Sequence, residues 1–211
     1  MSREARKIRD KWRAKAWFSV VAPPYFGGGE IASIPSDDPT KLVGRVVETT
    51  LYDITGDFSQ VHMKLRFQVT TVKGGQAETI FKGHEYSRDY LRSLVRRGSS
   101  RVDGIFEVKT KDNYRLRISV IAFTVTRIKT SQAQALRAVM RRISQERAEA
   151  LTFDQFVQEA VLGKIASDIY NEGKKIVPLR HVGVYKSKLL AWPGAEKPVA
   201  EVVEVLEKPA V

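Results

Sequence analysis

Few side chains in this sequence are of the types that perform covalent or metal chemistry. The three histidines, His62, His84 and His181, stand far apart along the chain, and there is no cysteine. No second ligand lies at metal-binding spacing from any of them, so a structural or surface role is expected for each. The glycine triplet at 27–29 lacks the Lys-Ser/Thr pair of a phosphate-binding loop. The sequence therefore predicts no catalytic residue, no metal and no cofactor, and we expect no enzyme activity.

Aromatic and basic side chains alternate near the N-terminus, an arrangement suited to nucleic acid. Residues 1–18 contain seven Lys or Arg against two acidic residues, a net charge of +5. Basic side chains contact phosphates while exposed rings stack on unpaired bases, at about 1–3 kcal/mol per stacked base. The alternative is that Trp17 and Phe18 anchor this segment on the core. The candidates for RNA binding in this arm are Arg9, Lys11, Trp12, Arg13 and Lys15.

Arginines spaced four residues apart mark a second candidate surface. Arg88, Arg92 and Arg96 fall at i, i+4 and i+8 of a helix predicted over residues 87–97, with Arg97 beside them. A stripe of like charges lowers helix stability by repulsion unless an anion lies along it. A face that is simply solvated is the alternative interpretation.

Two further pairs of arginines extend the predicted basic surface. Arg137 and Arg141 lie at i and i+4, off the apolar stripe of a second predicted helix, although nearby glutamates could offset them. Arg115 and Arg117 occupy the solvent-facing end of a predicted strand, whose other end is expected to be buried on both faces. Nothing resembles a helix-turn-helix or a zinc finger. We therefore expect recognition of shape and phosphate backbone, with steep salt dependence.

These candidates are carried by a succession of predicted strands and helices. Residues 61–70 alternate apolar and polar side chains, which is typical of a half-buried strand. The proline- and glycine-rich residues 22–40 predict an irregular connector. The glycines of residues 73–76 predict a hairpin turn. Further strands are expected at 42–54, 77–84, 102–110, 114–129 and 176–190, and capping residues predict helices from Ser87, Ser131 and Thr152.

Hairpin-linked strands followed by helices predict an α+β fold, with a closed or nearly closed antiparallel β-barrel and packed helices. The expected organisation is a basic arm and irregular connector at 1–40, a barrel domain at 41–190 and a flexible acidic tail at 191–211. No apolar run approaches the roughly 18 residues of a membrane span, and no secretory signal is expected.

The charge balance favours a polyanionic partner. The 211 residues include 36 Lys or Arg and 24 Asp or Glu, a net charge of +12. Twelve basic residues face five acidic ones in residues 80–129. RNA is the expected partner, and neither a membrane nor a small-molecule substrate is expected. Two alternatives stay open: a free regulator that binds single-stranded RNA and, less favoured, an enzyme that acts on RNA.

Several segments, taken in order, carry a resemblance to a known family. They are residues 11–26, 44–48, 81–84, 87–97, 108–117, 165–170, 176–180 and 182–190. Together these segments are similar to the S3Ae family of small-subunit ribosomal proteins from archaea and eukaryotes. The arm lacks the longer lysine-rich run of the eukaryotic members, which favours an archaeal-type member.

The resemblance implies a β-barrel core bound in the cytoplasm to the platform of the small ribosomal subunit, near the mRNA exit. The implied partners are small-subunit rRNA and neighbouring ribosomal proteins, and mRNA near the exit is a further candidate. The residues that the resemblance makes candidates for RNA contact are Lys11, Trp12, Arg88, Arg92, Arg96, Arg97, Arg115 and Arg117.

Overall fold

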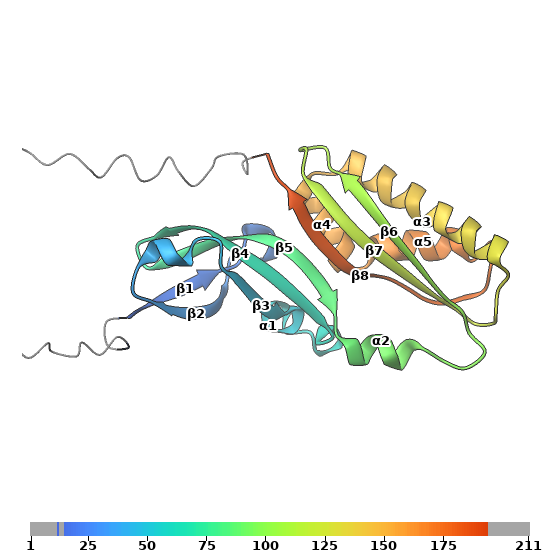
Figure 1. Ribbon diagram of the computed structural model, residues 1–211, viewed down its shortest axis with the longest axis horizontal. Coiled ribbons are helices and arrows are strands. Elements are labelled where there is room, and N and C mark those ends of the chain that lie inside the picture. Colours follow the sequence, from blue (N-terminus) through green and yellow to red (C-terminus); the bar gives the residue numbers. More distant parts are fainter. Residues whose placement is uncertain (1–11, 13–14, 194–211) are drawn as a thin grey trace, which may run out of the picture. The chain divides into compact units, whose positions relative to one another are not determined.

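The computed structural model describes residue 12 and residues 15–193, and the chain forms two compact units (Figure 1). The first unit is Met1–Tyr90 and the second is Leu91–Val211. The division falls inside the short helix α2 (Arg88–Leu94). The acidic tail from residue 194 onward lies outside the described residues.

The first unit is built on a mixed five-stranded sheet. Its strand order is β2-β1-β5-β4-β3, with β1 parallel to β5 and every other neighbouring pair antiparallel. The turn at residues 73–76 joins β4 to β5 as the sequence predicts, with Lys73 opposite Gln76. The strands are β1 (Ala16–Val21), β2 (Glu30–Ser36), β3 (Val46–Thr50), β4 (Met63–Lys73) and β5 (Gln76–Tyr86).

Aromatic and aliphatic side chains from separate strands form the core of this unit. The buried rings of Phe67 and Phe81 pack edge to face, and the ring of Phe26 contacts both. Phe26 comes from the 3₁₀ turn η1 (Pro24–Phe26). A smaller cluster nearer β1 consists of Val20, Leu42, Val69 and Ala77.

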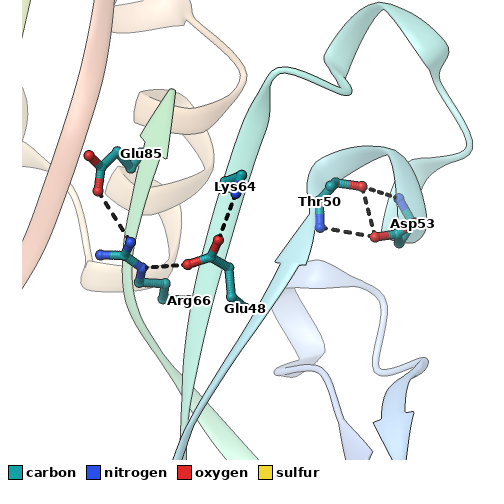
Figure 2. Close-up of polar contacts among 6 residues, drawn as sticks. All are labelled: Glu48, Thr50, Asp53, Lys64, Arg66 and Glu85. Atoms are coloured by element: carbon teal, nitrogen blue, oxygen red, sulfur yellow. Dashed lines mark hydrogen bonds and ion pairs between the residues drawn. The ribbon is translucent and has the colours of Figure 1, made fainter. Parts of the chain in front are cut away.

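The strand expected at 42–54 is interrupted by a short helix. Thr50 and Asp53 cap one another: Thr50 N–H donates to Asp53 Oδ2 at 3.0 Å, and Asp53 N–H donates to Thr50 Oγ1 at 3.3 Å (Figure 2). This reciprocal capping box satisfies two backbone donors at once. It therefore ends β3 at Thr50 and starts helix α1 (Leu51–Thr55). The 3₁₀ turns η2 (Pro39–Leu42) and η3 (Phe58–Gln60) flank this region in the sequence.

The second unit packs three helices against an antiparallel sheet. The strand order is β8-β7-β6, and α3 contacts β6 while α5 contacts β8. Leu136 and Met140 on α3 are fully buried. The elements are β6 (Arg101–Lys109), β7 (Arg115–Thr124), α3 (Thr130–Ala150), α4 (Phe153–Val161), α5 (Lys164–Gly173) and β8 (Leu179–Ala191).

The α+β class is confirmed, but the prediction of a closed antiparallel barrel is wrong. In the first unit β2 and β3 form opposite edges of the sheet, and β1 runs parallel to β5. In the second unit helices bury the apolar side of β6. Alternation along a strand reports only that one face is buried. It does not report whether helices or further strands cover that face.

Two local departures from the sequence-based expectations have identifiable causes. Residues 22–40 contain strand β2, in which Pro35 is tolerated because β2 is an edge strand. The helix expected after Thr152 is divided into α4 and α5, because Gly163 adopts a left-handed φ of 85° between them.

Candidate nucleic-acid interface

Contacts with the first unit fix the N-terminal end of helix α2, which carries Arg88. Ser87 Oγ accepts a hydrogen bond from Tyr90 N–H at 3.3 Å, as the predicted cap requires, and Ser87 N–H donates to His62 O at 2.8 Å. The ring of Tyr90 stacks on His62 at 3.8 Å and meets Tyr86 edge to face. Burial lowers the pKa of His62, so the stacked ring is neutral at neutral pH. These contacts hold the start of α2, and with it Arg88, in one orientation on the first unit.

The predicted stripe of three arginines does not lie on one helical face. Arg88 and Arg92 share a face of α2, but the helix ends at Leu94 and Arg96 follows in the loop. Val95 is 55% exposed, so a further helical turn would bury little apolar surface. The prediction of an i, i+4, i+8 helical face is therefore wrong at its third member.

All four arginines of this segment are nonetheless exposed. Arg88, Arg92, Arg96 and Arg97 make no ion pair with any acidic side chain in the described part of the chain. Because no described acidic side chain compensates their positive charge, these arginines are available to bind an external anion. Among the predicted candidates that the structure describes, this group contains the most basic side chains without an ion pair.

Other basic side chains of the first unit are neutralised by ion pairs. Glu48 accepts from Lys64 Nζ at 3.0 Å and from Arg66 Nε at 3.0 Å, and Arg66 also pairs with Glu85 at 3.3 Å (Figure 2). These side chains project from neighbouring strands β3, β4 and β5. The sheet surface around Glu48 therefore contributes little net charge for RNA.

Replacing Glu48 with glutamine should lower the free energy of unfolding by less than about 1 kcal/mol near pH 7, because the pairs are partly exposed. Hydrogen bonds from Lys64 and Arg66 hold the pKa of Glu48 below its ordinary value of 4.5. The unfolded chain therefore takes up this proton first, so the contribution is present above pH 4.5 and is lost as the pH falls through the folded pKa. Urea unfolding of both proteins at about pH 6 and pH 3 measures this loss. An equal difference at both pH values would contradict the assignment.

Arg115 and Arg117 lie on the solvent-facing end of β7, as predicted, but share an acidic partner. Glu107 on β6 pairs with Arg117 at 2.6 Å and with Arg115 at 3.6 Å. The antiparallel register sets Glu107 opposite Arg117. From Ser119 onward β7 is buried on both faces, which also agrees with the sequence pattern. This pair of arginines therefore offers one net positive charge rather than two.

Arg137 and Arg141 project from the exposed side of α3. Arg137 Nε donates to Asp103 O at 3.0 Å, and the Arg141 guanidinium lies 5.5 Å from the centre of the Phe106 ring. These contacts orient both side chains along β6 without neutralising them. A groove of about 540 Å³ beside α3 is lined by both arginines and also by Glu146 and Glu149, but the ion pair of Glu146 is with Arg142, at 4.0 Å.

The N-terminal arm is described only in part. Arg9, Lys11 and Arg13 lie outside the described residues. The side chain of Trp12 is 61% exposed, and Lys15 Nζ lies 4.5 Å from the centre of its ring. Phe18 packs on the smaller core cluster, as the anchoring interpretation expects. Trp17 is 63% exposed, so its ring is accessible for stacking on a base.

The residues that the structure describes form neither a metal site nor a membrane-spanning helix. Over that part of the chain no three His, Cys, Asp or Glu side chains come together as a metal site. No helix there is long and apolar enough to cross a membrane. Sequence reasoning did overlook exposed cations in two loops of the second unit, Arg127 with Lys129 and Lys174 with Lys175, because each pair alone gives no pattern.

A basic α+β chain whose exposed arginines lack acidic partners among the described residues is typical of proteins that bind a polyanion such as RNA. A family model described as the Ribosomal S3Ae family matches residues 3–193, and the chain belongs to this family of ribosomal proteins. This membership confirms the resemblance read from the sequence and the expectation that the chain is not an enzyme.

Curated relatives match over nearly their whole length. The chain is 52% identical to "Small ribosomal subunit protein eS1" of Staphylothermus marinus, over 96% of this chain and 95% of the relative. Identity to the protein of the same name is 53% in Aeropyrum pernix, over 93% and 94% of the two chains. In Archaeoglobus fulgidus it is 46%, over 97% and 98%. These archaeal relatives agree with the expected archaeal type.

Proposed function

We propose that this chain is a structural constituent of the small ribosomal subunit and binds rRNA through its basic arm and the arginines of α2 and the loop after it. The proposal includes a cytoplasmic, ribosome-bound location on the platform near the mRNA exit, which the family resemblance implies. Neighbouring ribosomal proteins and mRNA near the exit are its further proposed partners. The names of the relatives support the small-subunit assignment.

The observation that carries the RNA contact is a set of exposed arginines without an acidic partner among the described residues: Arg88, Arg92, Arg96 and Arg97. The phosphate backbone of RNA offers closely spaced negative charges, and each neutralised phosphate releases a counterion. The stack of Tyr90 on His62 orders the base of α2 in advance, so less orientational entropy is lost when Arg88 binds. The arm adds cationic side chains and exposed indole rings. Such a surface neutralises charge and reads RNA shape without reading base sequence.

The remaining candidates contribute less in this scheme. Arg115 and Arg117 already share Glu107, so an RNA phosphate must compete with an ion pair at that position. Arg137 and Arg141 keep their charge but border a groove that also contains glutamates.

Sedimentation of native cell extract through a sucrose gradient tests the proposal. We expect the chain to travel with the small subunit at low salt and to stay bound at moderate salt, because many phosphate contacts act together. Immunodetection across the fractions measures this distribution. A chain found only at the top of the low-salt gradient would contradict the proposal and favour the free RNA-binding regulator.

A further inference from the structure

Three loops of the second unit meet at the end of its sheet where β6 begins and β7 ends (Figure 1). Ser100, before β6, and Thr124, at the end of β7, are joined by hydrogen bonds: Ser100 N–H donates to Thr124 Oγ1 at 2.9 Å, and Thr124 N–H donates to Ser100 O at 3.0 Å. Ile128 N–H donates to Ser100 Oγ at 3.3 Å, and Val125 N–H donates to Pro178 O at 3.0 Å. The loops at 95–100, 125–129 and 174–178 are therefore tied together as one surface.

This surface carries basic side chains and no acidic one. The three loops contain six cations and no Asp or Glu, a local charge of +6. All six side chains belong to exposed residues, and none forms an ion pair with a described residue. They are Arg96, Arg97, Arg127, Lys129, Lys174 and Lys175.

The acidic residues nearest in the sequence to the first and third of these loops are already engaged. Asp103 pairs with Arg101 at 3.0 Å, and Glu172 pairs with Arg142. The six cations thus lie on loops that are hydrogen-bonded to one another, and no described acidic side chain pairs with them. Such an arrangement raises electrostatic repulsion in the free protein, and a bound anionic partner relieves this repulsion.

We infer that these three loops form one continuous RNA-contact surface, which includes Arg96 and Arg97 of the proposed site and binds the phosphate backbone of structured RNA. The inference rests on the proposed rRNA-binding function and extends it to Arg127, Lys129, Lys174 and Lys175. The loops contain no Trp, Tyr, Phe or His, so they offer no ring on which an unpaired base can stack. Their chemistry suits the closely spaced phosphates of an RNA duplex, which proteins recognise by shape and backbone contacts.

A triple variant with Arg127→Gln, Lys174→Gln and Lys175→Gln tests this surface without changing the arginines of α2. The matched control, Lys41→Gln with Lys64→Gln and Lys73→Gln, removes the same charge from cations that are paired with Asp38, Glu48 and Glu78. The probe is a labelled RNA hairpin of about 20 base pairs, a length on the scale of known duplex-binding domains. Affinity for the full-length chain is measured from about 50 to 200 mM salt.

The loop variant should bind the hairpin roughly tenfold or more weakly, and the slope of log affinity against log salt should fall by about 2 to 3. The control should change the affinity less than threefold and the slope by less than about 1, because its cations are already compensated. Thermal unfolding of each variant separates lost binding from lost folding, since Lys174 and Lys175 also follow the C-terminal end of α5.

Equal losses in both variants would overturn the inference, because net charge alone would then explain the binding. Unchanged binding by the loop variant, with tight binding by the natural chain, would overturn the loop surface and leave the proposed function standing. A natural chain that does not bind the hairpin would contradict the proposed rRNA binding itself.

Discussion

Reversing Arg88, Arg92 and Arg96 to glutamate is expected to abolish incorporation of the chain into small subunits while the fold stays intact. The three side chains are exposed and have no acidic partner among the described residues, so the fold does not depend on their charge. The reversal replaces three attractions to phosphate with three repulsions. Tagged variant and natural chains expressed in the same cells, followed by gradient sedimentation, measure incorporation directly.

A control variant separates this site from the effect of net charge. Lys41→Glu, Lys64→Glu and Lys73→Glu change the charge by the same amount at cations that are already paired. We expect this variant to enter subunits nearly as well as the natural chain. Normal incorporation of the arginine variant would show that α2 and the following loop do not hold rRNA.

Replacing Phe81 with alanine should lower the free energy of unfolding by about 3–5 kcal/mol, because it leaves a cavity in the core of the first unit. Phe81 is 1% exposed and contacts the rings of Phe26 and Phe67. Urea unfolding followed by circular dichroism measures the loss. The matched control is Phe58→Ala, since Phe58 is 79% exposed and should lose less than about 1 kcal/mol. Similar losses from both variants would contradict the described core.

Features that depend on near neighbours in the chain could be predicted from the sequence. The alternation in residues 61–70 corresponds to β4, and the glycine turn after Lys73 joins it to β5 as expected. Ser87 caps α2, and β7 passes from one buried face to two. These features follow from side-chain period, capping hydrogen bonds and turn residues, which act over a few positions.

Features that depend on distant segments could not be predicted in this way. The register of β6 against β7 brings Glu107 to Arg117, and this pairing reduces the charge of a candidate site. Helix α2 ends before Arg96, at a point where Val95 is 55% exposed and another turn would bury little apolar surface.

The class of partner could be predicted from the sequence, but the surface that contacts the partner could not. Net charge is a sum over residue types, so a basic protein with a polyanionic partner was evident from the sequence, and family membership was evident from ordered local motifs. Contacts between residues far apart in the chain decide which basic side chains have an acidic partner. They also decide which loops lie together. Arg127 and Lys174 belong to one surface because strand pairing brings the end of β7 beside the start of β8.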